Sequence, residues 1–71
     1  MDNKVMEFVV FMIHALANAW NKPCPWVYQK LNHTGALDDY LIPCYDVLHT
    51  LGKEYLIDDI TGYIKERGFE I

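Results

Sequence analysis

The sequence is poor in basic residues, and this shortage excludes one large class of partners. Lys and Arg number only six, against ten Asp and Glu, so the net charge is −4 at pH 7. Binding to nucleic acid needs clustered basic side chains that neutralise phosphates. We therefore expect no nucleic-acid partner.

Cysteines and long apolar runs are also scarce. Cys24 and Cys44 are too few for the disulfide framework of a small secreted domain, so we interpret both as free thiols.

Near the N-terminus, Lys4 stands between acidic residues and His14 interrupts the apolar stretch, whereas an export signal needs a basic start and an unbroken apolar centre. The stretch is also shorter than the about 20 apolar residues that span a bilayer. These features predict a soluble, cytoplasmic protein with no membrane partner.

Apolar surface, by contrast, is present in excess. The composition is 52% hydrophobic and 14% aromatic over 71 residues. A single domain of this size buries only roughly 60% of the surface that its unfolded chain exposes. Because a small monomer cannot easily hide so much apolar surface, the composition predicts that a second chain covers part of it. The simplest expectation is a homodimer.

The spacing of apolar residues predicts an all-α fold. Apolar side chains recur three and four residues apart, Pro25 suits the first turn of a helix, and Gly35, Gly52 and Gly68 suit helix ends. No segment alternates with period two for long enough to indicate a strand. We expect one domain, residues 1–71, in which short helices pack around the N-terminal one. The expected helices are 3–21, 25–33, 36–42, 43–51 and 53–67, with Pro43 ending the third and opening the fourth.

The N-terminal helix is apolar on nearly all sides. Besides its inward stripe, Met6, Val10 and Phe11 extend the apolar surface around the cylinder. A helix of this kind is either central in its domain or buried at a dimer interface.

The same periodicity predicts the core and the solvated surface. The expected core residues are Val5, Phe8, Val9, Met12, Ile13, Leu16, Trp20, Trp26, Val27, Tyr28, Leu31, Leu41, Val47, Leu48, Leu51, Leu56, Ile57, Ile60, Tyr63 and Ile64. Asp38, Asp39, Asp58 and Asp59 are expected on solvated helix surfaces.

Four residues within the run 38–60 are candidates for binding a partner protein. Tyr40, Tyr45, Asp46 and His49 are neither clearly core nor clearly solvent-facing. Tyrosine commonly anchors protein interfaces, although most aromatic residues at helical spacing are simply core. The leading hypothesis is a protein-interaction module that binds through an acidic and aromatic face.

An enzyme or metal-binding protein is the first alternative. Asp46 and His49 lie three residues apart, so a carboxylate could orient an imidazole, with Cys44 nearby. The chain also contains the ligand types that zinc prefers, at His14, Cys24, His33, Cys44 and His49. However, no closely spaced Cys or His pairs occur and no oxyanion-forming loop is evident. We therefore expect no catalytic, cofactor-binding or metal-binding residues.

A helix-turn-helix DNA-binding regulator is the second alternative. The helices expected on either side of Gly35 have suitable proportions. Asp38 and Asp39 would face phosphates, and no Lys, Arg, Asn or Gln lies between Ala36 and Gly52 to read base edges. The charge therefore disfavours this alternative.

Three segments resemble a family of short bacterial proteins known as domain of unknown function 3791. They are EFVVFMIHALA (Glu7 to Ala17), VYQKL (Val27 to Leu31) and LDDYLIPCYDVLHTLGKEYLIDDITGYIKERG (Leu37 to Gly68). The most specific part is YLIPCYDVLHTLGKEYLIDDI. The resemblance implies a stand-alone helical bacterial protein of the cytosol and carries over no catalytic or ligand residue. It also implies a gene neighbourhood with an ADP-ribosyltransferase-like partner, as in toxin–antitoxin modules, and hence an antitoxin-like or regulatory role.

Overall fold

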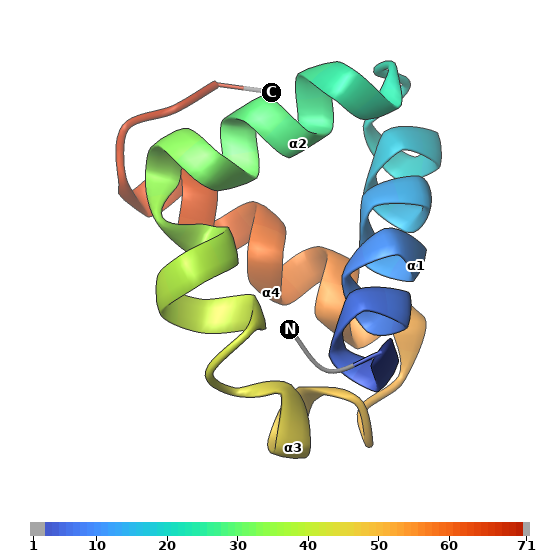
Figure 1. The fold of residues 1–71 in the computed structure, drawn as a ribbon. Helices are drawn as coiled ribbons and strands as arrows, with labels where there is room; N and C mark the ends of the chain where they lie inside the picture. Colours follow the sequence, from blue (N-terminus) through green and yellow to red (C-terminus); the bar gives the residue numbers. More distant parts are fainter. Residues whose placement is uncertain (1–2, 71) are drawn as a thin grey trace.

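The computed structural model describes residues 3–70, which form five helices and no strand (Figure 1). In chain order they are α1 (Asn3–Trp20), α2 (Cys24–Thr34), η1 (Ala36–Leu41), α3 (Tyr45–Leu48) and α4 (Lys53–Glu66). The predicted all-α fold is confirmed. Residues 1, 2 and 71, which the expected domain also includes, lie outside the described range.

One core joins these helices, and α3 contributes only Leu48 to it. α1 packs on α2 and α4, and η1 packs on α2 and α4. The largest fully buried side chains are Met12, Leu16, Val27, Leu31, Leu41, Leu56, Ile60 and Ile64. Trp20 at the end of α1 also donates a 2.9 Å hydrogen bond from its indole nitrogen to the Thr61 hydroxyl of α4. Within residues 3–70, no helix is both long and apolar enough to cross a membrane.

The third helix is a π-helix, whose hydrogen bonds span one residue more than those of the expected α-helix. It begins after Gly35, which adopts the left-handed conformation with φ of 81°. Its last hydrogen bond runs from the Ile42 N–H to the Leu37 carbonyl, at 3.0 Å. Pro43 has no N–H to donate, so the helix cannot continue.

The expected helix over residues 43–51 is wrong in extent. Only Tyr45–Leu48 is helical, a single turn, and the chain then bends before α4. Leu48 is buried, but Val47 is 64% exposed and Leu51 37% exposed, so their placement in the core is also wrong. A single turn can direct only one side inward, and Leu51 lies beyond it.

Two other sequence expectations need correction. Tyr28 is exposed because Val27 and Leu31 occupy the inward side of α2. Asp59 is partly buried and is not simply solvated, because it accepts a hydrogen bond from Tyr40. The partly buried residues packed against the core include Val5, Ile13, Trp20, Trp26, Ile57 and Tyr63.

Candidate functional site

The four residues predicted to bind a partner do not share one site. Tyr45 and His49 line one groove, and Tyr40 lines another. Asp46 is exposed on α3 and belongs to neither lining. The structure therefore brings together only two of the four.

The first groove, called here the apolar groove, has a volume of about 310 Å³. It is lined by side chains from α1, from α3, from the segment between α3 and α4, and from α4 itself. They are Lys4, Glu7, Phe8, Phe11, Tyr45, His49, Leu51 and Leu56. The Phe8 and Tyr45 rings meet edge to face, with centroids 5.4 Å apart. His49 stacks on Tyr45 at 4.5 Å, and its Nδ1 lies 2.7 Å from the Tyr45 carbonyl oxygen. These contacts fix both rings in the wall of the groove.

The enzyme and metal alternative finds no support in this geometry. The sequence hypothesis uses the Asp46 carboxylate to orient the His49 imidazole, but the Nδ1 of His49 lies against the Tyr45 backbone carbonyl instead. Cys44 is a free thiol, partly buried against the core. Across residues 3–70, no three His, Cys, Asp or Glu side chains are grouped so that they could hold a metal ion.

The helix-turn-helix alternative meets the charge problem that the sequence predicts. The element after Gly35 is a π-helix of six residues, with Asp38 and Asp39 in its first turn. Both carboxylates are exposed. A phosphate backbone would be repelled by this surface.

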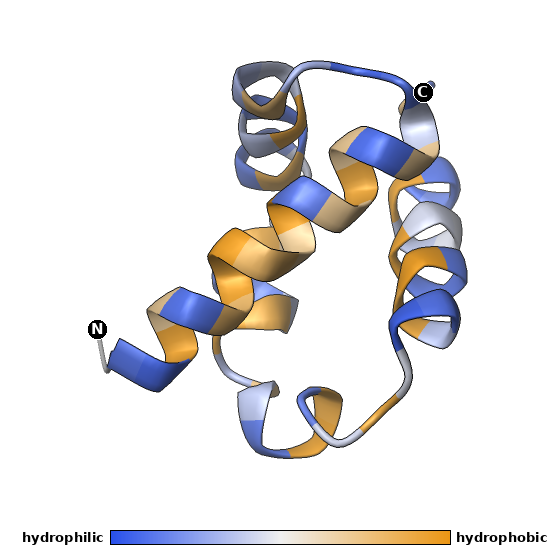
Figure 2. Ribbon diagram, turned by 90° about the vertical axis from the view of Figure 1, so that its right-hand side faces the viewer, coloured by the Kyte–Doolittle hydropathy of each residue, from blue (hydrophilic) through white to orange (hydrophobic). Residues whose placement is uncertain are grey.

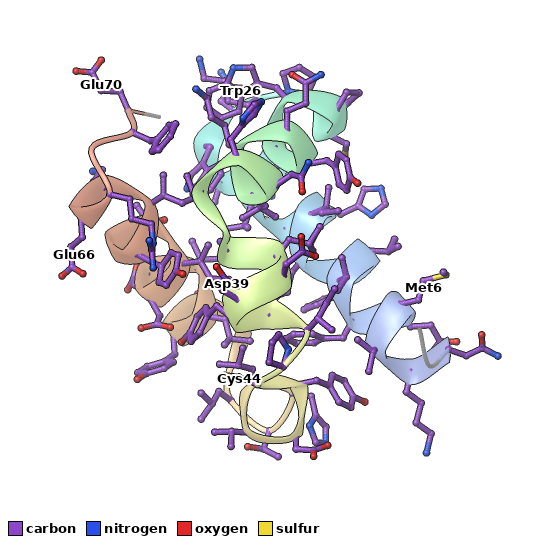
Figure 3. All side chains as sticks on the ribbon, turned by 60° about the vertical axis from the view of Figure 1, so that its left-hand side comes forward. Met6, Trp26, Asp39, Cys44, Glu66 and Glu70 are labelled. Atoms are coloured by element: carbon purple, nitrogen blue, oxygen red, sulfur yellow. The ribbon has the colours of Figure 1, made fainter. Side chains whose placement is uncertain are left out.

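The second groove, called here the acidic tyrosine groove, lies where η1 meets α4 and has a volume of about 370 Å³. It is lined by Tyr40 of η1 and, on one face of α4, by Asp58, Asp59, Gly62, Tyr63 and Glu66. The labelled Glu66 projects from the C-terminal part of α4 in Figure 3. Three carboxylates thus surround the two tyrosine rings. Gly62, which lies between these residues on α4, adds no side chain to the groove.

A hydrogen bond joins the two sides of this groove. The Tyr40 hydroxyl donates to the Asp59 carboxylate, across 19 positions of the sequence. Burial of the phenol, and then this bond to Asp59, hold the pKa of Tyr40 well above its usual value. A tyrosine is protonated at neutral pH in any case, and the raised pKa keeps Tyr40 a donor in more alkaline solution as well. Its hydrogen bond holds Asp59 at the edge of the rings.

Two stacked rings lie in the lining of the groove, and one guanidinium outside the lining contacts one of them. The Tyr40 and Tyr63 rings are nearly parallel, 9° apart, with centroids separated by 5.1 Å. The guanidinium carbon of Arg67 lies 4.3 Å from the Tyr63 ring centroid. Such cation–π contacts favour a guanidinium on a tyrosine face. Arg67 does not line the groove itself, but its contact shows that the Tyr63 ring can accept a guanidinium.

Sequence reasoning found Tyr40 but missed most of its neighbours. Tyr63 was expected to be core, and Asp58 and Asp59 to be simple solvated surface. A signal was present, because Asp59, Tyr63 and Glu66 recur at the spacing of one helix face. The position of η1, which brings Tyr40 beside that face of α4, could not be predicted from the sequence.

Comparison with known proteins identifies a family. Neither a search of curated proteins nor a search of solved structures finds a significant match. A family model described as "Protein of unknown function (DUF3791)" matches residues 7–67, a range that contains the whole acidic tyrosine groove and nearly all of the apolar groove. This match covers most of the chain and confirms the resemblance seen in the sequence, so the protein belongs to the DUF3791 family.

Proposed function

We propose that this protein is a small helical protein-interaction module that binds a basic segment of a partner protein in the acidic tyrosine groove. The observation that carries the proposal is the arrangement of Asp58, Asp59 and Glu66 around the stacked Tyr40 and Tyr63 rings. An antitoxin-like or regulatory role in the cytoplasm fits such binding.

The chemistry of the groove favours arginine as the bound side chain. A planar guanidinium can stack on a tyrosine ring while it donates hydrogen bonds to carboxylates. Arg67 already shows this stacking on Tyr63 within the chain. A basic partner also suits the whole molecule, whose net charge is −4, because opposite charges speed and orient association.

A titration with a short peptide tests the proposal. The probe is acetylated triarginine amide, with triglutamate of the same form for comparison, and the readout is the backbone amide signals of the protein by NMR. We expect triarginine to shift the signals of Gly62 and Tyr63. Its affinity should fall as salt rises from about 0.02 M to about 0.3 M, because salt screens exposed charges. Equal shifts with triglutamate would refute the proposal.

A matched pair of double variants sharpens this test. Asp58→Asn with Glu66→Gln removes two charges from the groove, and we expect triarginine affinity to fall about fivefold, since each exposed ion pair contributes little. Asp46→Asn with Glu54→Gln makes the same chemical changes at exposed positions outside the groove, and should change the affinity by less than about twofold. Equal losses in both variants would show that only net charge matters.

A further inference from the structure

The outward side of α1 is apolar at its centre. Met6, Val10 and Phe11 are 52%, 45% and 49% exposed, while Met12 and Leu16 on the inward side are fully buried. Figure 2 shows the apolar middle turns of α1 at the front of the molecule. Isolated exposed apolar residues are ordinary, but three within two turns of one helix form a patch of the kind that marks interaction sites.

This patch continues into the apolar groove. Phe11 is both half-exposed on α1 and part of the groove lining. Leu51, also exposed, lines the same groove from the segment before α4. A partner that covers the outward side of α1 would therefore also meet the groove beside Phe11.

Polar residues are placed symmetrically around the centre of this patch. Glu7 and His14 lie one turn before and one turn after the adjacent pair Val10 and Phe11, and both are exposed. If two copies of α1 pack antiparallel about an axis between residues 10 and 11, each residue faces the one equally far on the other side of the axis. Val10 then faces Phe11 of the other copy, and Glu7 faces His14. The surface is therefore complementary to itself, because apolar residues face apolar residues and each carboxylate faces an imidazole that can donate a hydrogen bond to it.

We propose that a second copy of this chain packs on α1 in this antiparallel way, giving a two-fold homodimer. A two-fold interface uses the same patch on both subunits and so requires a self-complementary surface, which the outward side of α1 provides. The acidic tyrosine groove cannot serve this purpose. Two copies joined there would bring like carboxylates together, which is unfavourable.

The available area indicates a dimer of modest affinity. A stable interface usually buries about 800 Å² on each partner, about a sixth of the 4546 Å² surface of this chain. The 18-residue α1 is about 27 Å long and about 10 Å wide, so its outward side alone offers less than that. The contact therefore extends over the apolar groove, and we expect dissociation on dilution, with a Kd on the order of 10 µM.

A charge swap across the two-fold axis tests both the occupant and its orientation. Sedimentation equilibrium of the full chain, from about 1 µM to about 500 µM, measures the dimer Kd. Glu7→Lys should raise the Kd about fivefold, because the change acts twice in a symmetric dimer and removes both carboxylate–imidazole contacts. His14→Glu should raise it by a similar factor by opposing two carboxylates. The double variant Glu7→Lys with His14→Glu should return the Kd to within about twofold of the original.

Two outcomes would overturn the proposal. A monomer throughout the concentration range would rule out the second copy, and a dimer that the double variant fails to restore would rule out the antiparallel contact. Both substituted positions are exposed, and thermal unfolding followed by circular dichroism confirms that each variant is folded. The triarginine titration at Gly62 reports on the proposed function separately, so either proposal can fail while the other stands.

Discussion

The outward side of α1 and the acidic tyrosine groove differ in chemistry and in how the chain builds them. The first comes from one continuous helix and is apolar at its centre, with Val10 and Phe11 about half exposed. The second joins Tyr40 of η1 to one face of α4 and depends on contact between two helices. The comparison shows that a small core can leave two separate surfaces of different chemistry exposed, one with half-exposed apolar residues and one lined by carboxylates.

The largest expected effect is a difference in stability between substitutions on the inward and the outward side of α1. Leu16 is fully buried, so Leu16→Ala should lower the free energy of unfolding by about 2 to 5 kcal/mol. Val10→Ala on the outward side should lower it by less than about 0.5 kcal/mol. Urea unfolding at about 1 µM protein, where the monomer dominates, measures both. Similar costs would mean that Val10 is packed within the monomer.

The next largest effect tests whether the outward side of α1 and the acidic tyrosine groove bind independently. Val10→Asp places a charge in the proposed dimer contact, and we expect the dimer Kd to rise at least about tenfold. Triarginine affinity should stay within about twofold, because Val10 does not line the acidic tyrosine groove. Sedimentation equilibrium and the NMR titration give the two numbers. If Val10→Asp weakened both dimerisation and triarginine binding, the two surfaces would not be independent.

A smaller effect concerns the bond that holds the acidic tyrosine groove together. Tyr40→Phe removes the hydrogen bond to Asp59 and should lower the free energy of unfolding at pH 7 by about 0.5 to 1.5 kcal/mol. The dimer Kd should not change.

The pH dependence of this effect follows from the raised pKa of Tyr40. Its contribution is fully present below the unfolded pKa, about 10. It is lost as pH rises through the higher pKa of the native state, because the unfolded state releases the proton first. The wild-type advantage over Tyr40→Phe should therefore shrink from pH 9 to pH 11 in urea unfolding. A constant difference across this range would contradict the assignment of Tyr40 as the donor.

The smallest effect is expected at Asp46, the predicted site residue that lines neither groove. Asp46→Ala removes an exposed side chain on α3, and stability should remain within about 0.5 kcal/mol. Dimer and triarginine affinities should both remain within about twofold. A clear loss of either affinity would mean that Asp46 belongs to a binding site.

The sequence predicted those features that depend on local pattern. Apolar spacing gave the inward side of α1, including Met12 and Leu16, and also the surplus apolar surface at Val10. Gly35 marked the turn after α2 because its left-handed conformation favours glycine. Local rules were sufficient here because each feature lies within one helix or at its end.

Features that depend on tertiary structure could not be predicted in this way. The helix around Leu48 is a single turn, which leaves Val47 in solvent despite its apolar side chain. The pairing of Tyr40 with Asp59 depends on how η1, a π-helix, packs against α4. Apolar periodicity does not distinguish a π-helical turn from an α-helical one over six residues.

One NMR experiment tests directly whether the two surfaces are separate. Backbone amide spectra are recorded during dilution of the protein alone and during addition of triarginine at fixed protein concentration. We predict that dilution shifts the signals of Val10 and Phe11 and leaves Gly62 in place, whereas triarginine shifts Gly62 and Tyr63 and leaves α1 in place. If the same signals move in both series, the two surfaces are a single site and this account is wrong.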